Sequence, residues 1–202
     1  RFANPQMREA YGVDSMPETA ENVADEWRIT REEQDVFALA SQQKAAAAIA
    51  SGRIAAEIVP VSVPQKNGDP VIVERDEHPR ATRLETLAKL KAVVRAYGTV
   101  TAGNASGLND GAAAMLVASE GAASRHGLIP RARVLGMAAA GIAPRVMGAG
   151  PIEAARKLSR ITGIGLDQLD VIELNEAFAA QAIATLRELK IASDEPRANR
   201  NG

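Results

Sequence analysis

The chain has 202 residues, with 24 Lys and Arg against 25 Asp and Glu and no cysteine. This length allows one or two domains with a sizeable core. The balanced charge gives no bulk electrostatic reason to expect nucleic acid or a membrane surface as a partner, and no apolar run approaches the ~20 residues that span a bilayer. Without cysteine there is no disulfide framework, no thiolate metal site and no thiol nucleophile, and we expect no metal.

The two ends of the sequence resemble internal positions of a longer protein. The chain opens on Arg1-Phe2 without a start methionine, and no apolar core of a signal peptide follows. It stops abruptly at Gly202. We therefore expect an internal piece of a larger protein, located in the cytoplasm.

The first predicted elements are two helices. Residues 20–27 follow Pro17-Glu18-Thr19, a combination that suits a helix N-terminus. Thr30 and Glu33 have the spacing of a capping box, in which each side chain satisfies the other's free backbone N–H. Apolar residues then recur at helical spacing until Gly52, which predicts one long helix.

A hairpin and an amphipathic segment are predicted next. Residues rich in Val and Ile flank Asn67-Gly68, which predicts a β-hairpin of 58–63 and 71–73. Residues 76–97 combine five basic side chains with a leucine stripe. This pattern is typical of a solvated helix, although a basic surface for an anionic ligand is the alternative.

Residues 99–111 contain three of the glycines and several short polar side chains. Small residues let a ligand approach the backbone, but an ordinary loop has the same composition. Residues 112–118 are apolar and predict a buried strand or helix, and 120–126 predict a short surface helix.

The C-terminal part alternates between predicted strands and helices. Residues 133–137 and 170–174 are the strands, and 151–160 and 175–189 are the helices, with a Gly/Pro loop at 141–150. This order implies a parallel α/β layer. Ligands in such layers bind beyond the carboxyl ends of the strands, so the chemistry is expected near Asn175.

Several blocks together resemble the thiolases, which are acyl-CoA C-acyltransferases. Two blocks carry most of this resemblance, Gly103-Asn-Ala-Ser-Gly-Leu-Asn-Asp-Gly111 and Asn175-Glu-Ala-Phe-Ala179. Further matching blocks are Thr19–Ala24, Arg31 with Gln34–Asp35, Glu57–Pro60, and Met147-Gly148 with Gly150-Pro151. The blocks occur in the family's order over essentially the whole chain.

The resemblance implies a layered αβαβα fold of two similar halves with an inserted loop domain, of which only the middle is present. Residues 1–108 would be the latter part of the loop domain, 109–129 the end of the N-terminal half, and 130–202 the start of the C-terminal half. The family's nucleophilic cysteine would lie before Arg1. Its Gly-His-Pro histidine and second cysteine would lie after Gly202. The 202 residues alone are therefore expected to be inactive.

In the chemistry that the resemblance implies, a cysteine thiolate attacks the ketone of a 3-oxoacyl-CoA and acetyl-CoA leaves as an enolate. The thiol of a second CoA then takes the acyl group. Asn175 matches the family asparagine that holds a water in an oxyanion hole, a task that suits a neutral amide able to donate and accept. The alternative for Asn175 is an N-cap of the following helix.

The resemblance also implies which residues bind the substrate. Ser106 matches the serine that bonds the pantetheine arm, and Lys91 stands near the expected CoA nucleotide, where many relatives have arginine. Read without the resemblance, the apolar members of this set are more often core residues. The residues that match the walls of the tunnel are Met16, Ala102, Leu108, Ala177 and Phe178.

The run Tyr11–Ala20 resembles a subgroup that cleaves 3-oxoadipyl-CoA with CoA to succinyl-CoA and acetyl-CoA during degradation of aromatic compounds. Many relatives carry His-Met-Gly where this chain has Ser15-Met16-Pro17, so the wall of the acyl pocket differs. Because the acyl chain cleaved by that subgroup ends in a carboxylate, a polar pocket wall is expected. One alternative is a broad-specificity acetyl-CoA acetyltransferase or a fatty-acid 3-ketoacyl-CoA thiolase. Another is a CoA-binding remnant without catalysis.

The resemblance implies no permanently bound cofactor, because coenzyme A is a substrate. The expected partners are CoA and acyl-CoA, without nucleic acid or membrane. A homo-oligomer, dimer or tetramer, is expected for the full-length protein.

Overall fold

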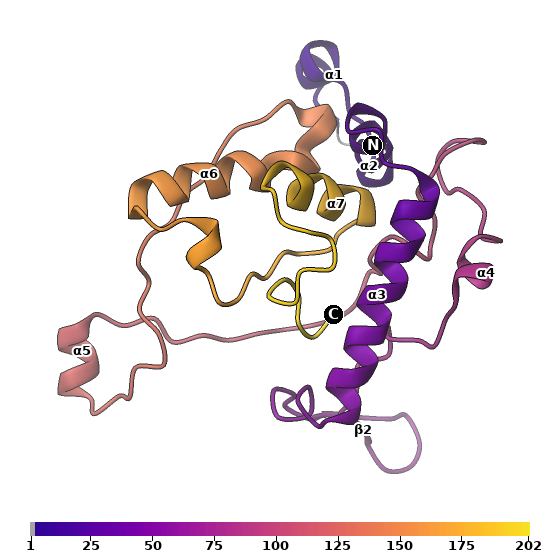
Figure 1. Ribbon diagram of the computed structural model, residues 1–202. Helices are drawn as coiled ribbons and strands as arrows, with labels where there is room; N and C mark the ends of the chain where they lie inside the picture. Colours follow the sequence, from indigo (N-terminus) through magenta and orange to yellow (C-terminus); the bar gives the residue numbers. More distant parts are fainter. Residues whose placement is uncertain (1–2) are drawn as a thin grey trace.

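The structure is a computed structural model that describes residues 3–202. Helices dominate it, and the one sheet in the described residues has two strands. Figure 1 shows the long helix α3 beside α7, with α2 near the start of α3 and α6 on the other side of α7, while α5 lies apart on an extended arm. The elements are α1 (Pro5–Tyr11), α2 (Met16–Glu26), α3 (Arg31–Ala50), β1 (Val61–Val63), β2 (Val71–Val73), α4 (Leu84–Leu87), α5 (Glu120–Arg125), η1 (Pro144–Ala149), α6 (Gly150–Thr162), η2 (Leu166–Gln168) and α7 (Ala179–Glu188).

The predicted helices of the first part are confirmed. The helix predicted at 20–27 is α2, which begins four residues earlier, with the side chain of Ser15 at its N-cap. The long helix is α3, and its capping box forms in both directions: Glu33 N donates to Thr30 Oγ1 (3.1 Å) and Thr30 N to Glu33 Oε2 (2.8 Å). The helices predicted at 120–126 and 151–160 are α5 and α6.

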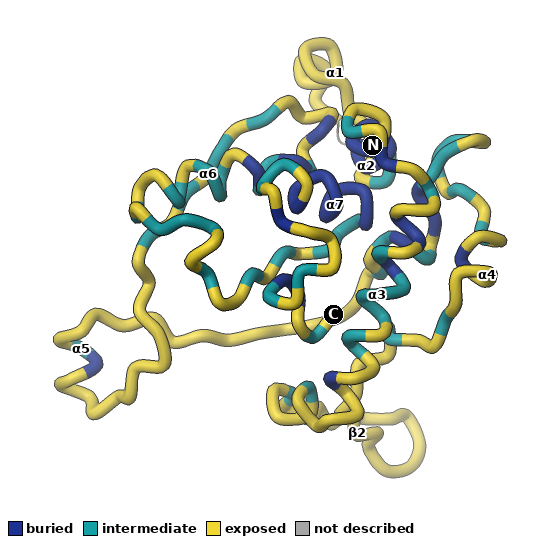
Figure 2. Tube along the Cα trace, viewed as in Figure 1, coloured by how far each residue is buried: buried dark blue, intermediate teal, exposed yellow. Residues whose placement is uncertain are grey.

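The core forms around α7. Every residue from Ala179 to Leu186 is buried, so the helix has no solvent face over two turns. Its alanines let α2 and η1 approach closely, and the shared cluster consists of Val23, Ala24, Ile29, Val146, Ala179, Ala180, Ile183 and Ala184. Figure 2 shows this burial concentrated in α7 and in the adjoining parts of α2 and α3.

The hairpin is confirmed, with Val61 opposite Val73 and Val63 opposite Val71 in an antiparallel register. All six strand residues are exposed.

The predicted helix at 76–97 is wrong except for α4. The carbonyls of Leu87 and Leu90 accept from the Arg31 guanidinium at 2.6 and 3.1 Å. Further on, Ala92 pairs with Thr101 as an isolated bridge. Because an arginine from α3 satisfies these carbonyls, the chain leaves the helix after one turn.

The expected buried strand or helix at 112–118 is also wrong, since these residues are extended and exposed. The same holds for the strand expected at 133–137. Of the strand expected at 170–174 only a bridge between Ile172 and Ala198 forms. A strand needs a neighbour for its backbone hydrogen bonds, and within residues 3–202 no other segment pairs with the first two.

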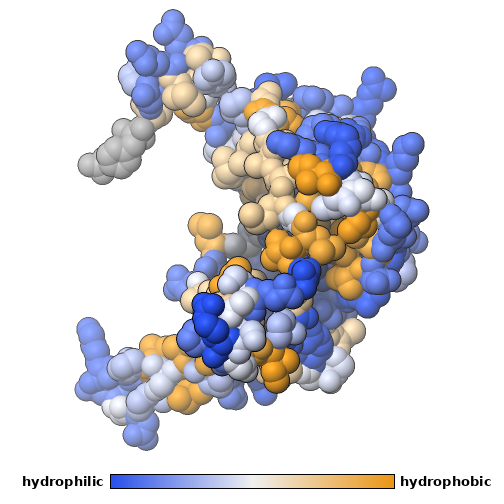
Figure 3. Space-filling view, turned by 90° about the vertical axis from the view of Figure 1, so that its left-hand side faces the viewer, coloured by the Kyte–Doolittle hydropathy of each residue, from blue (hydrophilic) through white to orange (hydrophobic). Residues whose placement is uncertain are grey.

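An apolar groove of about 460 Å³ lies between residues 133–136, α6, the segment 164–174 and the end of α7. Figure 3 shows that one side of the molecule is hollowed and carries hydrophobic residues around the hollow.

Among residues 3–202, no helix combines the length and apolar character that a bilayer crossing requires.

Three elements of the core meet at Glu188 on α7. The carboxylate accepts from Arg156 Nη2 on α6 (2.9 Å) and from Trp27 Nε1 after α2 (3.0 Å). The bond from Arg156, followed by that from Trp27, lowers the pKa of Glu188 below its ordinary value of 4.5. This carboxylate therefore ties α2 and α6 to α7 while it is ionised.

The lowered pKa predicts how stability depends on pH. Because the folded-state pKa lies below the unfolded one, the contribution of Glu188 is present above the unfolded value and is lost as the pH falls through the folded value. Glu188→Gln should therefore destabilise the chain at about pH 6, and the difference from wild type should shrink towards about pH 3. Urea unfolding followed by the fluorescence of Trp27, the one tryptophan, measures this. A difference independent of pH would contradict it.

Candidate functional site

The two blocks that carry the family resemblance lie side by side. Ser106 N donates to Ala177 O (3.0 Å) and Ala179 N donates to Asn104 O (2.9 Å). Between these bonds Ala105 and Phe178 form an antiparallel bridge. This pairing of residues 104–106 with 177–179, called the seam below, joins segments more than 70 residues apart.

The seam brings together Ser106, Ala177 and Phe178 of the predicted site. Ser106 is exposed, whereas Ala177 and Phe178 are half-buried. Ala102 is exposed in the turn just before the seam. The seam thus sets Ser106, Ala177 and Phe178 next to one another along two paired backbone segments, and Ala102 precedes it.

The other predicted binding residues lie outside the seam. Met16 begins α2 and Lys91 precedes the bridge of Ala92 with Thr101; both are exposed. Leu108 is fully exposed at the start of the arm. Within residues 3–202, no hydrogen bond or strand pairing joins Met16, Lys91 or Leu108 to the seam, so their binding role stays a prediction.

Asn175 is exposed and lies four residues before α7. The N-cap of that helix is Phe178, without a side-chain bond, so the N-cap interpretation of Asn175 is wrong. Asn175 instead lines a pocket of about 460 Å³, formed by Glu173, Leu174, Asn175, Glu176, Asn199 and Gly202. Its amide is thus accessible from the pocket, as an oxyanion-hole residue requires.

A buried carboxylate fixes the start of the loop that leads to Ser106. Glu21 on α2 is 1% exposed and accepts from Thr99 N (2.9 and 3.0 Å), Thr99 Oγ1 (2.9 Å) and Val100 N (2.9 Å). A Cβ at Gly98 would lie 2.2 Å from Glu21 Oε1. The loop can therefore approach the carboxylate only with glycine at position 98.

Asn104 holds the next turn of the same loop. Its Oδ1 accepts from Thr101 N (2.7 Å), and its Nδ2 donates to Thr99 O (3.0 Å) and Asp35 Oδ1 (3.1 Å). Asp35 is in turn paired with Arg31 at 2.8 Å. Every hydrogen-bonding atom of the Asn104 side chain that points into the core is thus satisfied.

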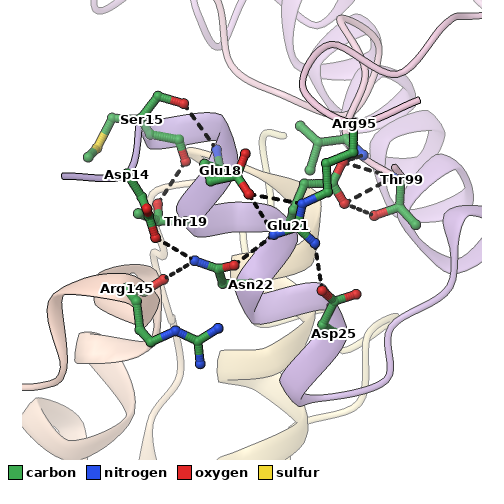
Figure 4. Close-up of polar contacts among 12 residues, drawn as sticks. Asp14, Ser15, Glu18, Thr19, Glu21, Asn22, Asp25, Arg95, Thr99 and Arg145 are labelled. Atoms are coloured by element: carbon green, nitrogen blue, oxygen red, sulfur yellow. Dashed lines mark hydrogen bonds and ion pairs between the residues drawn. The ribbon is translucent and has the colours of Figure 1, made fainter. Parts of the chain in front are cut away.

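Arg95 links the loop to the first turns of α2. It donates to Glu18 (2.7 and 2.9 Å), Asn22 (2.8 Å) and Asp25 (2.6 Å), as Figure 4 shows. The hydrogen bonds to Glu18 and then to Asp25 raise the pKa of Arg95 above its ordinary range. Asn22 also donates to Asp14 and to Arg145 O, at 2.9 Å each.

Sequence reasoning missed Glu21, Asn104 and Arg95 as supports of the site. Glu21 and Asn104 fall inside family-matching blocks, but their partners lie 69 to 79 residues away in sequence. The available signal was that Glu21, an acidic residue, and Asn104, an amide residue, stand among small and apolar residues of a predicted helix and a predicted loop. Groups of three or more acidic or histidine side chains that could hold a metal do not occur among residues 3–202.

The comparisons with known proteins identify the family. Residues 3–121 match the model of the thiolase N-terminal domain and residues 128–202 that of the thiolase C-terminal domain. The chain belongs to the thiolase family. The family match confirms the predicted fold class, a partial layered α/β thiolase fold, although the expected strand at 133–137 and the expected strand or helix at 112–118 lack pairing partners within residues 3–202.

Relatives and solved structures agree with this assignment. The chain is 62% identical over its whole length to a beta-ketoadipyl-CoA thiolase of Pseudomonas putida, covering 50% of that protein, and 52% identical over 96% of its length to an acetyl-CoA acetyltransferase of Pseudomonas aeruginosa, covering 49%. The chain thus spans about half the length of the relatives it matches.

Two solved thiolase-type structures are also similar. A Bacillus anthracis acetyl-CoA acetyltransferase has a TM-score of 0.88 and 46% identity, with 93% of this chain and 47% of that one covered. Human mitochondrial 3-ketoacyl-CoA thiolase in complex with CoA has a TM-score of 0.85 and 42% identity, with 93% and 46% covered.

The buried position of Glu21 generates a stability prediction. Glu21→Gln keeps the shape but turns an NH₂ group towards the donors of Thr99 and Val100, so buried donors lose their acceptor. We expect a loss of about 2 kcal/mol in the free energy of unfolding, measured by urea denaturation. Glu32→Gln, on the exposed first turn of α3, is the control and should change stability by less than about 0.5 kcal/mol. Equal effects of the two substitutions would contradict a special role for Glu21.

Proposed function

We propose that the protein to which this chain belongs is a thiolase that cleaves 3-oxoadipyl-CoA with CoA to succinyl-CoA and acetyl-CoA. The observation that carries the proposal is the seam, because it sets the Gly-Asn-Ala-Ser loop against the Asn-Glu-Ala-Phe turn. The first block supplies polar contacts for a pantetheine arm, and the second block begins with Asn175. The high identity to a named beta-ketoadipyl-CoA thiolase supports the choice of substrate.

In this proposal the residues of the chain bind and orient, while the nucleophile belongs to the rest of the protein. A cysteine thiolate attacks the ketone carbon of the substrate, and the bond between that carbon and the acetyl-CoA unit breaks. The acetyl-CoA enolate then takes a proton. A CoA thiol, losing its proton as it attacks, takes the acyl group, and the cysteine thiolate leaves. Asn175 would hold the water that donates to the developing oxyanion, and Ser106 would bond the pantetheine arm.

The segment before α2 bears on the acyl chain, which ends in a carboxylate. Ser15 caps α2, accepting from Glu18 N at 3.4 Å, and Glu18 is paired with Arg95. A substrate carboxylate near Met16 would meet the Ser15 hydroxyl, which can still donate while its oxygen accepts from Glu18 N. This polar wall favours the dicarboxylic substrate over a plain fatty-acyl chain.

Several further statements stay proposals at this level. They are the division into 1–108, 109–129 and 130–202, a homo-oligomeric assembly, the cytoplasmic location, and the binding roles of Met16, Lys91, Ala102, Leu108, Ala177 and Phe178.

Thiolysis by the full-length protein tests the substrate. Acetyl-CoA release should give a kcat/KM at least about tenfold higher with 3-oxoadipyl-CoA than with acetoacetyl-CoA, because only the former uses the polar wall. The 202-residue chain, which has no cysteine, should show no turnover and is the control. A preference for acetoacetyl-CoA would favour the broad-specificity acetyltransferase. Absence of turnover with retained CoA binding in calorimetry would favour the non-catalytic remnant.

Ser106→Ala in the full-length protein tests the pantetheine contact. Loss of one neutral hydrogen bond of about 1 kcal/mol should raise KM for CoA roughly fivefold, with kcat changed less than about twofold. Ser119→Ala, which removes only the cap of α5 on the outlying arm, is the control. An unchanged KM would contradict the assignment of Ser106.

A further inference from the structure

Asn199 has a backbone conformation that calls for an explanation. Its φ is 43°, in the left-handed region, and the residue is 6% exposed. Asparagine tolerates this region better than most residues, but such conformations persist where surrounding contacts hold them. Those contacts all lead to the segment that carries Asn175.

The Asn199 side chain pairs with the backbone of Leu174 in both directions. Its Oδ1 accepts from Leu174 N at 2.8 Å, and its Nδ2 donates to Leu174 O at 2.8 Å. A carboxamide offers the same donor and acceptor as a peptide group. Two residues earlier the pairing is made by backbone, with Ile172 N donating to Arg197 O and Asn199 N to Ile172 O, both at 2.9 Å.

The same side chain also reaches past Asn175. Asn199 Nδ2 donates to Glu176 Oε1 at 2.5 Å. Asn199 therefore holds the backbone of the residue before Asn175 and the side chain of the residue after it. Asn175 itself stays exposed, and both asparagines line the same pocket.

The turn that carries Asn199 is anchored to the long helix α3. Lys44 Nζ donates to Ala198 O at 3.0 Å. A Cβ at Gly202 would lie 2.3 Å from Ser41 O, so this glycine lies against the helix backbone. The left-handed turn is thus a rigid link from α3 to the segment 172–176.

We propose that Asn199 is a positioning residue that fixes Asn175 for its task in the oxyanion hole. The proposal rests on the proposed thiolase function. The Asn199 side chain forms the last rung of hydrogen bonds between the two segments, at Leu174. The pairing therefore does not continue as a strand into Asn175, and the peptide and side chain of Asn175 are turned to the pocket. Since a displacement of about 1 Å in a catalytic group can reduce the rate by about 10²-fold, the rigidity of this rung should appear in kcat.

Asn199→Ala and Asn199→Asp in the full-length protein test the inference. Alanine removes all three side-chain bonds. Aspartate keeps an acceptor for Leu174 N but opposes Leu174 O and the Glu176 carboxylate. We expect kcat for thiolysis to fall by about 30-fold in both variants, while KM for CoA stays within about twofold.

Arg200→Ala is the matched control on the same turn. Arg200 is exposed and its Nη2 donates to Asp170 O at 3.0 Å, so this variant loosens the start of the same segment and not its end. It should keep kcat within about twofold of wild type. Equal loss of kcat in Asn199→Ala and Arg200→Ala would overturn the inference, as would a change confined to KM.

A double variant separates positioning from general loss of structure. In Asn199→Asp combined with Glu176→Gln, the glutamine amide can donate to the new carboxylate, so kcat should recover at least about fivefold over Asn199→Asp alone. Additive losses would overturn the inference. Thermal unfolding shows which variants are folded. If Asn199→Ala does not fold, the comparison of Asn199→Asp with the double variant decides. A wild-type protein without turnover would instead refute the proposed function.

Discussion

The seam between residues 104–106 and 177–179 is the constraint on which the rest of the arrangement depends. Two backbone hydrogen bonds of 2.9 and 3.0 Å join a loop of the thiolase N-terminal domain to the entry of α7, a helix of the C-terminal domain. Because α7 is buried on all sides over two turns, the seam fixes the loop relative to the core. The loop in turn is held from behind by Glu21 and Asn104.

Local signals predicted the helices well. The capping box of Thr30 and Glu33 and the proline at the start of α6 act within one helical turn, and both appear as expected. The end of the helix expected at 76–97 is different, because it depends on Arg31, which lies 56 residues from the carbonyl of Leu87. Val134, Leu135 and Leu116 have the residue types of a strand, but strand formation depends on a neighbour that sequence pattern alone does not supply.

In the candidate site, too, some residues could be predicted from the sequence, whereas residues that act through distant partners could not. The family resemblance implied binding roles for Ser106, Ala177 and Phe178, and the structure sets these residues next to one another. Asn175 was predicted through the family resemblance, and the structure removes its alternative role as a helix cap. Asn199 and Glu21 could not be assigned from sequence, since each acts through partners that only folding brings near: Asn199 reaches Leu174 25 residues away, and Glu21 reaches Val100 79 residues away.

The absence of cysteine first indicated a chain without thiol chemistry. Because the chain spans about half the length of the relatives it matches, the absence of cysteine from these 202 residues does not bear on thiol chemistry in the whole protein. The described residues place polar groups by rigid contacts: a buried carboxylate under one loop, and the Asn199 amide paired with Leu174 beside the bridge at Ile172. Neither device reacts, and each costs buried polar surface that only full hydrogen bonding offsets. In the proposed function, contacts this rigid would suit the orientation of a thioester, and they stand in a core that is otherwise built largely from alanine and branched apolar residues.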